Sequence, residues 1–156
     1  MRDAIKSSDF TISETGALGP PLIGALLRIP WETVRRRMLE RLHEQGFDDI
    51  DTPHLNVFLY PGPQGERPSE LAARMGVSKQ ALNYLLGELE RLGYLERRAD
   101  PHDRRSRRIA LTRRGESAGH AMREAVVELE HEWEARLGRK RFAQLQTLLR
   151  ELAGHA

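Results

Sequence analysis

The stretch that decides the fold runs from residue 67 to residue 115 and reads RPSELAARMGVSKQALNYLLGELERLGYLERRADPHDRRSRRIALTRRG. It predicts a short helix, a tight turn at Gly76, a second helix, and two short strands around a basic loop. Pro68 suits the first helical position, where its missing N–H costs nothing, and Ser78 can cap the second helix. Two helices joined by a Gly-containing turn and followed by a hairpin predict a winged helix-turn-helix.

The second helix has two contrasting faces. On one face leucines recur at three- and four-residue steps, which predicts a buried stripe, and Val77 in the turn is expected to be buried beside it. The other face has no acid in its N-terminal half. It holds the candidate base-reading residues Ser78, Lys79, Gln80, Asn83 and Tyr84. Gln and Asn can bond adenine bidentately in a major groove, whereas a solvated polar face without a partner is the alternative.

The hairpin, or wing, is rich in arginine. Its expected strands are residues 94–98 and 107–111, with turn chemistry between Asp100 and Asp103. Phosphate contacts are expected from Arg97, Arg98, Arg107 and Arg108. Arg104 and Arg105 lie near the tip, where an arginine can enter a minor groove, and Asp103 can brace it by a charge-assisted bond. The alternative is an exposed basic hairpin, but so many neighbouring arginines favour an anionic partner.

Taken in order, these pieces resemble the MarR family of bacterial transcriptional regulators. The matching residues are the run SELAARMGVSKQALNYLLGELERLGYLER, the D-x-R of Asp103-Arg104-Arg105, and the LTRRG of Leu111 to Gly115. The resemblance implies a mainly α fold with a small β-hairpin wing, and a homodimer that binds double-stranded DNA, usually as a repressor. It also implies that the second helix enters the major groove and the wing arginine the minor groove.

Many members of that family release DNA when a small aromatic or phenolic effector, or an oxidant, acts on them. By resemblance, such an effector would bind between the winged helix-turn-helix and the dimerisation helices, near Trp31, Arg35 and His54. The alternative places Trp31 in the core and Arg35 on an exposed helix face. The chain has no cysteine, which excludes the cysteine-based peroxide sensing of some relatives.

The length of 156 residues predicts one MarR-like domain spanning residues 1–156. Residues 52–114 would form the winged helix-turn-helix, and residues 18–45 and 115–156 the dimerisation helices. Pro30 should kink or split the first helix near Ile29. The winged helix-turn-helix is too small to cover the apolar faces of the terminal helices, which favours pairing with a second copy over a monomeric bundle. A two-fold pair would place two recognition helices roughly 34 Å apart on a pseudo-palindromic site.

Charge is unevenly distributed along the chain. The formal net charge is +2, yet residues 67–114 hold twelve Lys or Arg against six Asp or Glu. This asymmetry is typical of a phosphate-binding face. The winged helix could instead serve as a protein-interaction or RNA-binding module without operator specificity. RNA-binding proteins generally use several stacking aromatic side chains, whereas Tyr84 is the only aromatic residue among the candidate base-reading residues of the second helix.

Enzyme chemistry is not indicated. The six histidines follow no repeating spacing, and there is no P-loop, dinucleotide fingerprint or G-x-S-x-G elbow. We therefore expect no catalytic residue, metal site or cofactor. No segment has the unbroken apolar length of a membrane span or the hydrophobic core of a signal peptide, so the sequence predicts a cytoplasmic protein.

Overall fold

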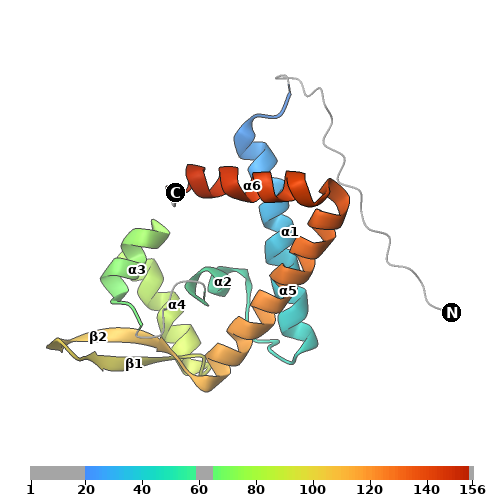
Figure 1. Cartoon of the computed structure of the whole chain (residues 1–156). Coiled ribbons are helices and arrows are strands. Elements are labelled where there is room, and N and C mark those ends of the chain that lie inside the picture. Colours follow the sequence, from blue (N-terminus) through green and yellow to red (C-terminus); the bar gives the residue numbers. More distant parts are fainter. Residues whose placement is uncertain (1–19, 59–64, 155–156) are drawn as a thin grey trace. The chain divides into compact units, whose positions relative to one another are not determined.

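The computed structural model describes residues 20–58 and 65–154 (Figure 1). The described chain is mainly helical, as predicted, and contains one antiparallel hairpin. Its helices are α1 (Ile23–Glu44), α2 (Thr52–Phe58), α3 (Pro68–Met75), α4 (Lys79–Arg91), α5 (Arg113–Leu137) and α6 (Arg139–Leu152); its strands are β1 (Leu95–Asp100) and β2 (Asp103–Leu111). Two compact units meet inside α1, the first ending at Thr33 and the second beginning at Val34.

Helix α1 corrects one prediction. It runs as a single helix from Ile23 to Glu44 with Pro30 inside it, so of the predicted kink or split near Ile29 the split is wrong. Proline has a helical φ and removes only one N–H, which a long helix tolerates at a cost of ~3 kcal/mol. In the first unit α1 exposes much of its apolar surface, and Trp31 is 41% exposed.

The second unit has a continuous hydrophobic core. The leucine stripe of α4 is confirmed, because Leu82, Leu86 and Leu89 are almost fully buried and Leu85 and Leu92 pack partly buried against them. The other fully buried core side chains include Met38, Leu42, Ile50, Leu55, Val57, Leu71, Tyr94 and Ile109. Helices α2 and α3 both contact α4, so α4 is positioned from two sides.

The turn between α3 and α4 differs from its prediction in one respect. Val77 is 37% exposed, so the expected buried plug is wrong. The turn is closed by backbone bonds instead: Gly76, with a φ of +64°, donates to the Ala73 carbonyl, and Val77 donates to that of Ala72. These two bonds satisfy carbonyls that the end of α3 would otherwise leave without donors.

Both ends of α4 are capped, and the N-terminal cap is the one that the sequence predicts. The Ser78 hydroxyl accepts the N–H of Ala81 at 3.1 Å. At the other end Gly93 adopts a φ of +79°, and the N–H of Tyr94 reaches the carbonyl of Leu89. This Schellman arrangement turns the chain from α4 into β1. Tyr94, which follows it, is fully buried and its ring contacts those of Phe47 and Phe58.

The hairpin is longer than expected and has a further attachment. Leu95 lies opposite Leu111, and the register shifts between Ala99 and Asp100. Glu66, just before α3, exchanges two backbone hydrogen bonds with Ile109 of β2, at 3.2 and 2.8 Å. The wing is therefore held to the entry of the helix-turn-helix as well as to its exit.

Gly115 supplies a test of the packing between α5 and the end of α4. A Cβ on Gly115 would lie 2.1 Å from the carbonyl oxygen of Tyr94. We expect Gly115→Ala to lower the free energy of unfolding by about 1–3 kcal/mol in urea denaturation, because backbone must move. Gly119→Ala is the control in the same helix: nothing lies within 4 Å of its added Cβ. That variant should gain about 0.5–1 kcal/mol. Equal stability of the two variants would contradict the packing described.

Candidate nucleic-acid interface

The base-reading candidates share one open face of α4. Ser78, Lys79, Gln80, Asn83 and Tyr84 are all exposed, and the buried leucines occupy the opposite side of the same helix. Tyr84, at 67%, has one of the most exposed large apolar side chains of the described residues. The caps at Ser78 and Gly93 hold this face rigidly, since both ends of the helix are closed by hydrogen bonds.

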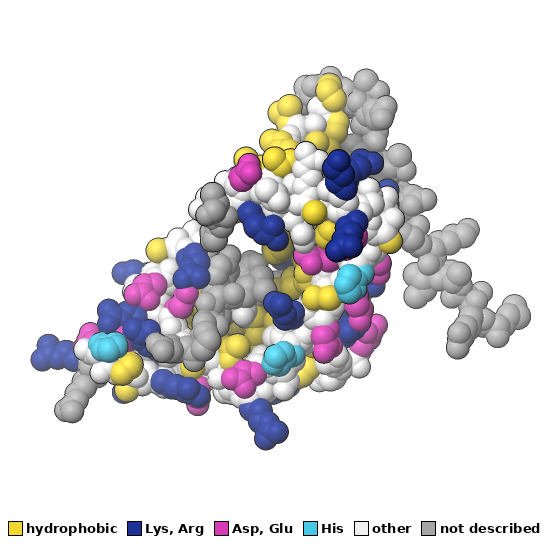
Figure 2. All heavy atoms as spheres, viewed as in Figure 1, with side chains coloured by type: hydrophobic (Ala, Val, Ile, Leu, Met, Phe, Trp, Pro, Cys, Tyr) yellow, Lys and Arg dark blue, Asp and Glu magenta, His cyan; other side chains and the backbone are white. Residues whose placement is uncertain are grey.

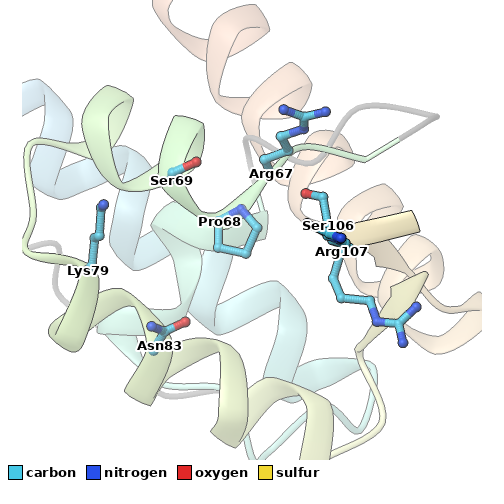
Figure 3. A pocket seen from close by; sticks show the side chains of 8 residues that line it. Arg67, Pro68, Ser69, Lys79, Asn83, Ser106 and Arg107 are labelled. Atoms are coloured by element: carbon cyan, nitrogen blue, oxygen red, sulfur yellow. The ribbon is translucent and has the colours of Figure 1, made fainter. Parts of the chain in front are cut away.

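A basic concavity joins this face to the wing. A cavity of about 310 Å³ opens between the start of α3, the first turns of α4 and strand β2, and Figure 3 shows its lining. Four of its lining residues are basic and none is acidic. The full lining is Arg67, Pro68, Ser69, Lys79, Asn83, Arg105, Ser106 and Arg107. Lys79 and Asn83, which the sequence assigns to base reading, therefore line the same cavity as two wing arginines. Of these, the sequence assigns Arg107 to phosphate and Arg105 to the minor groove.

The wing arginines are in three different situations. Arg105 and Arg107 are exposed and line the concavity. Arg97 donates through Nε to Glu90 of α4 at 3.2 Å, and Arg98 donates through Nε to Glu96 at 2.7 Å. The side chain of Arg104 lies outside the described atoms. Basic side chains also gather over the hairpin end of the surface in Figure 2.

Asp103 has a more local role than the sequence suggested. Its Oδ1 accepts the backbone N–H of Arg105 at 3.0 Å. The hydrogen bond that the structure assigns to Asp103 thus fixes the backbone of Arg105 rather than its guanidinium group. This contact is an Asx turn, which starts β2 and directs the arginine outward.

The buried carboxylate of the wing is Asp100, which the sequence analysis treated only as a turn residue. Asp100 is 2% exposed. Arg67 approaches its Oδ2 with Nε and Nη2, both at 2.8 Å, and Nε of Arg108 lies 3.1 Å from the same oxygen. The N–H of His102 donates to Oδ1 at 2.9 Å. Arg108, expected on phosphate, is therefore half-buried and directed at Asp100.

These contacts stabilise the ionised form of Asp100. The N–H of His102, and after it the guanidinium groups of Arg67 and Arg108, outweigh the effect of burial and lower the pKa of the carboxyl to about 2. No local sequence signal could identify Arg67 as the partner, because it precedes Asp100 by 33 positions. A buried carboxylate held by two arginines ties the wing to the first helix of the motif.

The effector candidates do not form one described site. Trp31 belongs to the first unit, whereas Arg35 and His54 belong to the second. His54 is only 6% exposed, and both of its ring nitrogens have protein partners. Nδ1 accepts the N–H of Asp51 at 3.0 Å, and Nε2 lies 3.4 Å from Glu88 Oε2.

Residues 20–58 and 65–154 contain neither a cluster of metal ligands nor a membrane span. No group of three or more His, Asp or Glu residues in this part of the chain is arranged to hold a metal ion. None of the helices described there is both long enough and apolar enough to cross a membrane.

The pKa of Asp100 predicts a specific pH dependence. A pKa lowered from the ordinary 3.8 to about 2 means that the stabilisation is complete above about pH 5. It is lost as the pH falls through 4 towards 2. Asp100→Asn should therefore be less stable than the wild type at pH 7 in thermal unfolding, and the difference in melting temperature should shrink between pH 4 and pH 2.5. Asp103→Asn, an exposed carboxylate on the same hairpin, is the matched control. A difference for Asp100→Asn that stays constant over this range would refute the assignment.

The fold is similar to that of known proteins. The model of the MarR family matches residues 58–106. Among solved structures, transcriptional regulator Tm0710 from Thermotoga maritima is 29% identical, with a TM-score of 0.56 over 83% of this chain and 89% of that one. Wild-type MarR from E. coli is 25% identical, with a TM-score of 0.65 over 85% of this chain and 96% of that one. No curated protein matches the chain by sequence.

Similar structures include complexes with DNA. The transcriptional repressor CouR, bound to a 23-mer DNA duplex, is 26% identical, with a TM-score of 0.65 over 85% of this chain and 92% of that one. CouR from Rhodococcus jostii RHA1 has also been solved with p-coumaroyl-CoA, and that structure is 24% identical to this chain.

Proposed function

We propose that the chain, whose residues 58–106 match the MarR family model, is a transcriptional regulator of that family and a sequence-specific repressor that binds a pseudo-palindromic operator as a homodimer. The observation that carries the proposal is the basic concavity shared by α3, α4 and β2. Its cations come from elements far apart in the sequence, and its lining includes no acid. In this proposal the protein acts in the cytoplasm and performs no catalysis.

The α4 face supplies the sequence preference in this scheme. Ser78, Lys79, Gln80, Asn83 and Tyr84 face one way from a helix that is capped at both ends, so a major groove can receive them together. Arg105 and Arg107 bind backbone or minor groove from the wing. Arg97 and Arg98 reach phosphate only by exchanging their bonds to Glu90 and Glu96.

The proposed homodimer is supported by apolar surface that the described chain leaves exposed. Helix α6 carries four leucines at three- and four-residue spacing, Leu145, Leu148, Leu149 and Leu152, which are 38–75% exposed. In the first unit Leu22, just before α1, and Ile23, Leu26 and Leu27 of α1 are also exposed. Under this proposal residues 18–45 and 115–156 are the dimerisation helices, and residues 52–114 are the DNA-binding part of one MarR-like domain. Two-fold pairing would match two half-sites about one DNA turn apart.

An aromatic effector is a further part of the proposal. CouR binds p-coumaroyl-CoA, an aromatic CoA ester. His54 would transmit the effect, since it contacts Glu88 of α4, and an effector near Trp31 and Arg35 would bias the dimer toward a spacing that DNA does not fit.

The competing candidate is a winged helix that binds protein or RNA. It explains the basic hairpin but gives no reason for an exposed α4 face that is free of acids from Ser78 to Gly87. Selection of bound sequences from random duplex DNA separates the two: a pseudo-palindrome supports the repressor, and salt-sensitive binding without a motif supports the alternative.

Arg105 tests the wing. We expect Arg105→Ala to weaken binding to the selected duplex by about 1–3 kcal/mol in a gel shift at fixed salt, because a minor-groove or phosphate contact is lost. Arg150→Ala removes the same charge from the last turn of α6 and should bind like the wild type. Unchanged affinity of Arg105→Ala would remove this residue from the interface.

Leu148 tests the dimer. Leu148→Asp places a charge among the exposed leucines of α6, so we expect light scattering to report about half the mass of the wild-type particle. Binding to the full pseudo-palindrome should fall with it. Thr147→Asp puts the same acid on the opposite side of α6 and should leave the mass unchanged. A wild-type protein with the mass of one chain would contradict the proposed dimer directly.

A further inference from the structure

The hydroxyl group of Tyr84 donates its proton in a hydrogen bond to another residue of the chain. The side chain is 67% exposed on the base-reading face, and its hydroxyl donates to Oε1 of Glu88, one helical turn later, at 3.1 Å. A phenol has one proton to donate, and a carboxylate can only accept. The pKa of Tyr84 is raised, first by this hydrogen bond and then by the charge of Glu88, so the proton stays on the tyrosine.

Glu88 is oriented from its other side by a buried histidine. Oε2 of Glu88 lies 3.4 Å from Nε2 of His54. The opposite ring nitrogen, Nδ1, accepts the backbone N–H of Asp51, so the neutral ring carries its proton on Nε2 and faces Glu88 as a donor. Both oxygens of Glu88 therefore act as acceptors, one toward α2 and the other toward Tyr84.

We propose that Glu88 is a positioning residue for DNA specificity: it fixes Tyr84 as a hydrogen-bond acceptor, and Tyr84 thereby selects a base that carries an exocyclic amino group. The inference rests on the proposed function, because it requires α4 to enter a major groove. It assigns a role to an acid that lies beyond the acid-free half of the helix and that does not itself need to touch DNA.

The chemistry of the major groove makes the selection definite. Adenine presents its N6 amino group there and cytosine its N4 amino group, whereas guanine and thymine present the acceptors O6 and O4. A hydroxyl whose proton points away toward Glu88 can bond either amino group and is repelled by either carbonyl oxygen. A tyrosine whose hydroxyl group is free to rotate could donate to a carbonyl oxygen or accept from an amino group, and so would not discriminate among the four bases. The base opposite Tyr84 in each half-site should accordingly be adenine or cytosine.

Selection from random duplex DNA with variants of the full chain tests the proposal. We expect the wild type to enrich one position per half-site in adenine or cytosine over guanine or thymine by roughly fivefold or more. Glu88→Gln should reduce that ratio to near one, because an amide both donates and accepts and leaves the tyrosine hydroxyl free to turn. Tyr84→Phe should do the same, and both variants should keep the rest of the motif.

Glu151→Gln, which removes a carboxylate from the exposed last turn of α6, controls for the loss of charge and should keep the wild-type ratio. If Glu88→Gln keeps the amino preference while Tyr84→Phe loses it, Tyr84 acts without Glu88 and the inference is overturned. If both variants keep it, the inference is overturned while the proposed function stands. If the wild type enriches no motif, the proposed function falls and the inference falls with it.

Discussion

The ion pairs of the Asp100 carboxylate are the contacts on which the arrangement of the winged helix-turn-helix depends. One buried oxygen receives Arg67, at the start of α3, and Arg108, in the middle of β2. Without this charge, two guanidinium groups would be close together and partly buried with no anion between them, which is costly. The contact therefore fixes where the wing lies relative to the helix-turn-helix. The basic concavity lies between the wing and the helices α3 and α4, so its shape depends on these ion pairs.

Other contacts hold the remaining parts of the winged helix-turn-helix together. Backbone bonds between Glu66 and Ile109 attach the segment before α3 to β2. At the far end of α4, the guanidinium group of Arg114 lies 4.3 Å from the ring centroid of Tyr94 and also donates to Asp49 and to the Leu92 carbonyl. Helix α4 is thus fixed at its C-terminal end to both α5 and the loop before α2. Its N-terminal half is left open on one side, where the base-reading candidates lie.

Sequence reasoning predicted the parts of this fold that depend on local chemistry. The helix-turn-helix followed from the leucine spacing, from the Ser78 cap and from the turn at Gly76, each of which acts within a few residues. It failed where neighbours distant in the sequence decide the outcome. The split of α1 that was one of the two outcomes expected at Pro30 failed for a local reason, because a proline removes one hydrogen bond and the remaining turns continue the helix. Asp100 read as a turn residue because its partner Arg67 lies two elements earlier, and His54 gave no sign of its contact with Glu88.

The pairing of Arg97 with Glu90 and of Arg98 with Glu96 changes how the charge of the wing should be counted. An arginine that already holds a carboxylate has an internal counterion that cannot diffuse away. When such an arginine moves to a phosphate, it frees an acid that must in turn attract a cation from solution, so the net release of ions is small. The ionic-strength dependence of binding would then count Lys79, Arg105 and Arg107 more fully than these two, and the chain's apparent number of phosphate contacts would fall short of its number of wing arginines.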